Sequence, residues 1–217
     1  MSPAKVMLSA KERDLVTSTD WILTKNEVIG KVYLLFGGLN EAYLQLAASF
    51  PALIAEKNYF ASPKIAKGEQ YRQLPWVMLD QPRMFSAENV LAVRSFFWWG
   101  NFCSITLHLS GTYLEKYAGA LKNYFAGQHS INESGWYYCI SANAWEHHFD
   151  ADNYVPLREE HILEPMGKPF IKIAKKIPLQ EWDRVSLFFM ENYQQILQML
   201  AAAPDKTMPH LSDETNP

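Results

Sequence analysis

Apolar side chains recur at helical spacing along the first fifty residues of the chain. One face of a helix would carry Val28, Ile29, Val32, Leu35 and Phe36. Gly37 and Gly38 would end this helix, and a further helix would run from Asn40 to the residue before Pro51. The pattern therefore predicts a helical N-terminal region.

Helix starts are also marked by Ser or Thr followed three positions later by Glu. In such a capping box the two side chains satisfy each other's free backbone amides. The boxes are Ser9 with Glu12, Thr24 with Glu27, and Thr112 with Glu115. They predict three helix starts at these positions.

Strands are indicated by short apolar runs and by alternation of apolar and polar residues. The expected strands are Trp76–Asp80, Phe102–Leu109, Trp136–Trp145 and Phe170–Ile177. Helices are expected from Ser86 to about Trp99, from Tyr113 to Phe125, and from Pro178 onward as a long last helix. Because two of these strands alternate, whereas parallel strands favour fully apolar runs, an α+β fold is predicted. Its sheet would have about four strands, mainly antiparallel or mixed, packed with helices.

Length and composition indicate how many domains the chain forms. The chain has 217 residues, of which 48% are hydrophobic, so one domain can form a core without metal or disulfide. We expect that domain at residues 1–203, followed by a flexible tail at 204–217, where prolines and polar residues predominate.

Charge and cysteine usage argue against several partners. The formal net charge is −3 and Lys and Arg are dispersed, so nucleic acid binding is not expected. No apolar run is long enough for a membrane span, and no signal-peptide pattern is present, which predicts a cytoplasmic protein without a membrane partner. Cys103 and Cys139 would lie on opposite faces of their strands and are expected as free thiols.

The alternating strands place small polar residues on one face each. Ser104, Thr106 and His108 share one face, and the other strand carries Tyr137, Ser141, Asn143 and Trp145. If the two strands are neighbours, these faces join into a polar platform with an aromatic rim, as in a ligand pocket. The competing interpretation is the solvent side of a half-exposed sheet.

Two arginines form a second candidate. Arg83 and Arg94 could hold a carboxylate or phosphate with the fork of the guanidinium group. The simpler interpretation is an ion pair between Asp80 and one of these arginines.

Metal-capable residues are densest just after the third predicted strand. A metal site would draw on His108, His147, His148 and Asp150. Such a site is not favoured, because adjacent histidines project to opposite sides of an extended chain and no HExxH spacing is present.

Complete catalytic or nucleotide-binding motifs are absent from the sequence, and no segment resembles a family that we can name. We therefore expect a non-enzymatic module without a cofactor, which binds a small molecule or a partner segment on the polar sheet face. The alternatives are a metal-dependent hydrolase and an interaction domain that forms a homodimer through exposed aromatic side chains.

Overall fold

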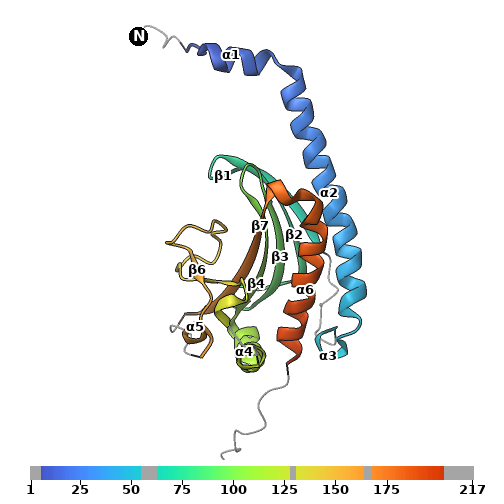
Figure 1. Cartoon of the computed structure of the whole chain (residues 1–217), viewed down its shortest axis with the longest axis vertical. Helices are drawn as coiled ribbons and strands as arrows, with labels where there is room; N and C mark the ends of the chain where they lie inside the picture. Colours follow the sequence, from blue (N-terminus) through green and yellow to red (C-terminus); the bar gives the residue numbers. More distant parts are fainter. Residues whose placement is uncertain (1–5, 55–62, 128–130, 164–167, 203–217) are drawn as a thin grey trace, which may run out of the picture.

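A computed structural model describes residues 6–54, 63–127, 131–163 and 168–202. Its centre is a seven-stranded antiparallel sheet with the strand order β1-β2-β3-β4-β7-β5-β6 (Figure 1). The strands are β1 Lys64–Tyr71, β2 Leu74–Phe85, β3 Val90–Trp98, β4 Phe102–Ser110, β5 Tyr137–Cys139, β6 Tyr154–Pro156 and β7 Phe170–Pro178. The helices are α1 Ala10–Thr17, α2 Thr19–Ala47, α3 Pro51–Ile54, α4 Gly111–Ala126, α5 Glu159–Leu163 and α6 Val185–Ala201, with short 3-10 turns at Ile131–Glu133 and Leu179–Arg184.

The helices α2 and α6 lie side by side along one face of the sheet, and α4 packs beside α6 (Figure 1). Between these layers lies the main core, where Tyr43 of α2 stacks on Tyr193 of α6 with ring centroids 3.7 Å apart. Sheet residues such as Val93 and Ile105 are fully buried against these helices. This face of the sheet is therefore covered by the helices.

The predicted α+β class and the long C-terminal helix are confirmed. The expected count of about four strands is wrong, because the sheet has seven. One cause is β3, where we predicted a helix from Ser86 to Trp99. All but one of the nine residues of β3 are buried, and a run buried on both faces cannot be assigned to strand or helix by its periodicity.

Two other expectations about strands fail. The expected strand Trp136–Trp145 is paired only over Tyr137–Cys139, and the chain then leaves the sheet. The expected strand at Trp76–Asp80 continues through the cis peptide bond between Gln81 and Pro82, so Pro82 does not end it. The strands β4 and β7 form where they were predicted.

The N-terminal helices also differ from the prediction. The helix α2 continues through Gly37, Gly38 and Asn40 in one element of 29 residues, because its buried stripe stays in phase from Ile29 to Ala47. The capping box of Ser9 with Glu12 is present, whereas Thr24 lies inside α2. At the start of α4 the cap residue is Ser110, and its side chain makes no capping bond.

The remaining expectations concern the chain ends, the thiols and the membrane. Cys103 and Cys139 are both buried free thiols, as predicted. The expected tail at 204–217 lies outside the described residues. Within the described ranges, none of the helices combines the length and apolarity that crossing a bilayer would need.

Candidate functional site

The polar face of the sheet is built by strands β2, β3, β4 and β7 on the side away from α2 and α6. Ser104, Thr106 and His108 of β4 lie on it, as period-two alternation predicts, and all three are buried. A segment between β5 and β6, residues 140–153, lies across this face, and we call it the cover loop (Figure 1). The face is therefore partly roofed and is not the solvent side of a sheet.

A chain of three polar groups crosses this face, with Asp80 and His147 buried and Arg94 half-buried. The guanidinium of Arg94 donates from Nε and Nη2 to the two carboxylate oxygens of Asp80, at 2.7 and 2.9 Å. Its Nη1 lies 3.1 Å from Nε2 of His147, which belongs to the cover loop. The simpler interpretation, an ion pair between Asp80 and one of the two arginines, is thus confirmed for Arg94. Its Nε, Nη1 and Nη2 atoms each already have a partner.

Lys172 of β7 attaches the cover loop from beneath. Its side chain is only 1% exposed, and its Nζ donates to the backbone oxygens of Ala144 and Glu146. It also lies 5.1 Å from the ring centroid of Tyr154. Burial lowers the pKa of Lys172 to about 8. The sequence analysis did not select Lys172, although a lone lysine between Ile171 and Ile173 interrupts an apolar run.

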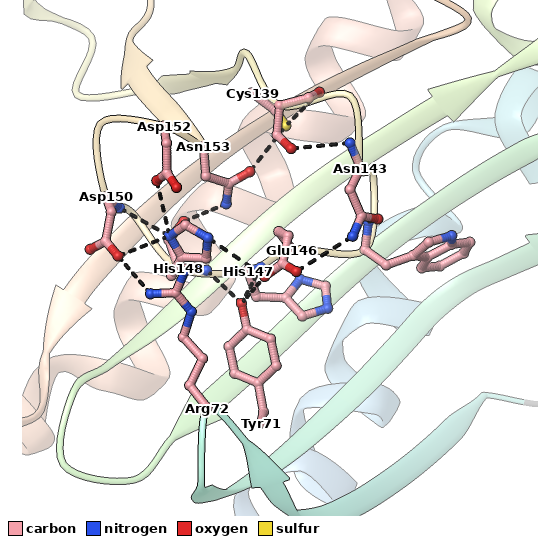
Figure 2. A network of polar contacts seen from close by, with 12 residues as sticks. Tyr71, Arg72, Cys139, Asn143, Glu146, His147, His148, Asp150, Asp152 and Asn153 are labelled. Atoms are coloured by element: carbon pink, nitrogen blue, oxygen red, sulfur yellow. Dashed lines mark hydrogen bonds and ion pairs between the residues drawn. The ribbon is translucent and has the colours of Figure 1, made fainter.

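Tyr71, the last residue of β1, attaches the cover loop from the other side. Its hydroxyl accepts the backbone N–H groups of His147 and His148 at 2.7 and 3.0 Å and donates to Oε2 of Glu146 at 3.0 Å. Figure 2 shows Tyr71 pointing at the backbone between the two histidines. Burial raises the pKa of Tyr71 to about 12, so the phenol keeps its proton as a donor. No sequence pattern marked this tyrosine.

Trp145, in the cover loop, borders three hollows on this side of the sheet. Their volumes are about 550, 380 and 350 Å³. Its side chain is 54% exposed, and its ring lies 5.6 Å from that of His108 and 6.0 Å from that of Phe85. The guanidinium of Arg94 lies 5.8 Å from the centroid of Trp145. The predicted residues Trp145, His108 and Arg94 are therefore brought together.

The 350 Å³ hollow, which we call the arginine hollow, is lined by three cationic side chains and one carboxylate. The cations are Lys64, Arg83 and Arg94, and the carboxylate is Asp80. Arg94 already binds both oxygens of Asp80, so Lys64 and Arg83 supply the excess positive charge. Trp145 closes one side of this hollow.

The other predicted site residues lie elsewhere. Tyr137 is on β5, which β7 separates from β4, so the two alternating strands are not neighbours. Ser141 and Asn143 belong to the cover loop and hydrogen-bond within it: the hydroxyl of Ser141 accepts the N–H of Asn143, and Oδ1 of Asn143 accepts the N–H of Trp145. These two residues shape the turn that presents Trp145.

The metal-capable residues are divided between two sides of the cover loop. His147 faces Arg94 and the sheet, while His148 lies among the carboxylates of Glu146, Asp150 and Asp152 (Figure 2). One ligand atom from each of His148, Asp150 and Asp152 falls within 4.8 Å of the others. The four residues expected for a metal are thus not one cluster, and Arg72 pairs with Asp150 at 2.7 Å.

Two histidines meet on the polar face, His108 from β4 and His147 from the cover loop, and burial there disfavours their charged forms. Burial, together with the charges of Lys172 and Arg94, lowers the pKa of His108 from 6.5 to about 4. Burial, again with Arg94 nearby, lowers the pKa of His147 well below 6.5. Both imidazoles therefore serve as uncharged partners at neutral pH.

These depressed values predict acid sensitivity. Between about pH 6.5 and 4 the unfolded chain binds protons that His108 does not, so the free energy of unfolding should fall as pH is lowered through this window. Urea unfolding at pH 7 and pH 4.5 measures the fall. The His108→Phe variant should lose less stability on acidification than the wild type, and an equal loss in both would contradict the assignment to His108.

We compared the chain with family models, curated proteins and solved structures, and none of them matches it.

Proposed function

We propose that the protein binds a small organic anion with a flat apolar part in the arginine hollow, without acting on it chemically. The observation that carries this proposal is the placement of Arg83. Its guanidinium lies 5.4 Å from the ring centroid of Phe85 at the border of the hollow. Within the described ranges no carboxylate pairs with it, unlike Arg94. A half-buried arginine of this kind can bind a carboxylate or phosphate through two parallel hydrogen bonds.

The charge around the hollow favours an anion. Asp80 is neutralised by two bonds from Arg94, which leaves the ammonium of Lys64 and the guanidinium of Arg83 to set the local potential. A neutral ligand would gain little from these groups, whereas a ligand with one carboxylate would gain charge-assisted hydrogen bonds.

The rings around the hollow favour a flat apolar part. Phe85 and Trp145 approach to 6.0 Å between centroids at a tilt of 44°, and the exposed ring of Trp145 offers a surface for stacking. The volume of about 350 Å³ is at the lower end of the range for small-molecule sites, roughly 300 to 1,000 Å³. The site is therefore suited to a compact ligand.

The titratable groups on this face support binding more than catalysis. His108 and His147 are held neutral by burial and nearby cations, with their pKa values lowered. The amine of Lys172, whose pKa is about 8, is already bonded to two backbone oxygens. General acid or base catalysis needs a group that is free to exchange its proton with a substrate.

Calorimetric titration with 2-naphthoate and with neutral 2-naphthamide tests the proposal. The wild type should bind the carboxylate and not the amide. The Arg83→Gln variant should bind 2-naphthoate at least about tenfold more weakly, which corresponds to the loss of roughly 1.4 kcal/mol. The matched control is Arg158→Gln, because Arg158 is exposed and lines none of the three hollows.

Equal affinity for acid and amide, or an unchanged affinity in Arg83→Gln, would contradict the proposal. The same preparations can be analysed for zinc, manganese and iron. A stoichiometric metal that is lost in a His148→Ala variant would favour the alternative, a metal-dependent hydrolase built on His148, Asp150 and Asp152.

A further inference from the structure

The largest of the three hollows around Trp145 is lined by a histidine that lacks a hydrogen-bond partner. This hollow has a volume of about 550 Å³, and we call it the histidine hollow. His108 lines it and is only 8% exposed. Within the described ranges neither ring nitrogen of His108 is hydrogen-bonded to another group, yet neither is sealed from the surface. The imidazole is therefore open to a molecule in this hollow.

The register of the sheet places His108 in the same row as Arg83. Arg83 of β2 lies opposite Ala92 of β3, and Ala92 lies opposite His108 of β4. Side chains directly opposite each other on neighbouring strands point to the same face. Because neighbouring strands lie about 4.8 Å apart, the Cα atoms of Arg83 and His108 are separated by about 10 Å. A guanidinium and an imidazole thus stand on one face, with a single methyl side chain between them.

The arginine hollow and the histidine hollow adjoin each other. Ser86 and Trp145 line both of them. The ring of Trp145 lies 5.6 Å from that of His108 and 6.0 Å from that of Phe85, which lines the arginine hollow. A flat ligand that stacks on Trp145 with its carboxylate at Arg83 can therefore extend its other end toward His108.

The charges around His108 select the chemistry of that other end. Burial and the charges of Lys172 and Arg94 lower the pKa of His108 to about 4, and the same charges disfavour a cationic group beside it. A second anionic group is disfavoured by Glu88 and Glu115, which line the histidine hollow and have no ion-pair partner among the described residues. A neutral hydroxyl group meets neither penalty, and it can donate to the uncharged imidazole.

We propose that the ligand of the arginine hollow is a hydroxylated aromatic acid, whose carboxylate binds Arg83 and whose hydroxyl group hydrogen-bonds to His108. The carboxylate end rests on the proposed function. The hydroxyl end goes beyond it, because it assigns a ligand class and makes His108 the residue that determines specificity within that class.

Calorimetric titration with 6-hydroxy-2-naphthoate, compared with 2-naphthoate, tests the hydroxyl contact. The wild type should bind the hydroxylated acid about fivefold more tightly, which corresponds to roughly 1 kcal/mol, a usual net value for one hydrogen bond. The methyl ether, 6-methoxy-2-naphthoate, should show no such gain, because it cannot donate a hydrogen bond to the imidazole.

The His108→Phe variant removes the hydrogen bond and keeps an aromatic ring at this position. Its affinity for the hydroxylated acid should equal its affinity for 2-naphthoate, so the ratio of the two falls to about one. The matched control is His161→Phe, because His161 stacks on Tyr138 and lines none of the three hollows. The control should keep the fivefold ratio, and cooperative urea unfolding verifies that both variants are folded.

A measurement on the wild type does not depend on the folding of a variant. In NMR spectra of the nitrogen-labelled protein, saturating 6-hydroxy-2-naphthoate should shift an imidazole nitrogen resonance of His108, whereas 2-naphthoate should shift it much less. The resonances of His161 should stay in place with both ligands.

The preference for a neutral group has its own ligands. An aminomethyl group or a second carboxylate in place of the hydroxyl group, as in 6-(aminomethyl)-2-naphthoate and naphthalene-2,6-dicarboxylate, should give weaker binding than the hydroxyl group. Tighter binding of either compound would overturn the assignment of a hydroxylated acid.

The remaining outcomes separate this inference from the proposed anion site. Equal affinity of the wild type for the hydroxylated acid and 2-naphthoate would overturn the hydroxyl contact and leave the anion site intact. A fivefold ratio that persists in folded His108→Phe, or an unshifted His108 resonance, would do the same. Failure of both acids to bind would overturn the anion site and this inference together.

Discussion

Replacing Asp80 by asparagine should destabilise the protein by about 3–5 kcal/mol, the typical cost of leaving a buried charge without its partner. The side chains of Arg94 and Asp80 are only 12% and 6% exposed, so water cannot replace the two lost charge-assisted bonds. Urea unfolding at pH 7 measures the difference.

The control for this substitution is Glu181→Gln. Glu181 pairs with Arg184 on the surface, where the side chains are 40% and 73% exposed, and such pairs contribute only about 0–1 kcal/mol. A double substitution of Asp80 to Leu and Arg94 to Met should recover much of the stability, because it removes both charges. A small effect of Asp80→Asn, similar to that of the control, would show that this pair does not support the sheet face.

Replacing Lys172 by methionine should release the cover loop. The substitution leaves the backbone oxygens of Ala144 and Glu146 without their donor, and each orphaned buried group costs about 1–3 kcal/mol. Removing the buried ammonium also relieves its desolvation, so the free energy of global unfolding should change less than the free energy of opening the loop. Amide hydrogen exchange in residues 140–153 should therefore accelerate by roughly thirtyfold or more, corresponding to about 2 kcal/mol or more.

Lys175→Met is the matched control. Lys175 lies on the same strand, but its Nζ donates to Gln195 of α6 on the helix-covered face. Its loss should leave exchange in the cover loop unchanged. If Lys172→Met exchanges at the rate of the wild type, Tyr71 and the contact of His147 with Arg94 suffice to hold the loop.

The elements that the sequence predicts best are those whose pattern has one period and one buried face. Strand β4, helix α4 and the stripe of α6 are of this kind, and Ser104, Thr106 and His108 lie on the face that alternation gives them. Strand β3 could not be predicted in this way. Its residues face helices on one side and the cover loop on the other, and because nearly all nine are buried, the strand shows no alternation.

Other elements depend on partners far away along the chain. Strand β1 is half-exposed and rich in charged residues, so its own residues carry no alternating signal, and its pairing with β2 forms it. The same holds for the site. Alternation predicted a polar face. Tyr71 and Lys172, which hold the cover loop in place, lie at least 75 and 26 positions away from their bonding partners.

Arg83 and Trp145 were both predicted as site residues from the sequence. The sequence did not predict that they line the same hollow. They meet because β2 continues past Asp80 and because Ser141 and Asn143 turn the cover loop so that Trp145 faces Phe85. Local patterns identify residue types with binding chemistry, whereas long-range packing decides which of them share a hollow.

The most direct test of the proposed binding site is a crystal structure of the protein soaked with 2-naphthoate. The account predicts ligand density in the arginine hollow, with the carboxylate within about 3 Å of the guanidinium of Arg83, the usual hydrogen-bond distance, and the rings against Trp145. Density at another place, or an unoccupied hollow at a ligand concentration that saturates binding in solution, would contradict it.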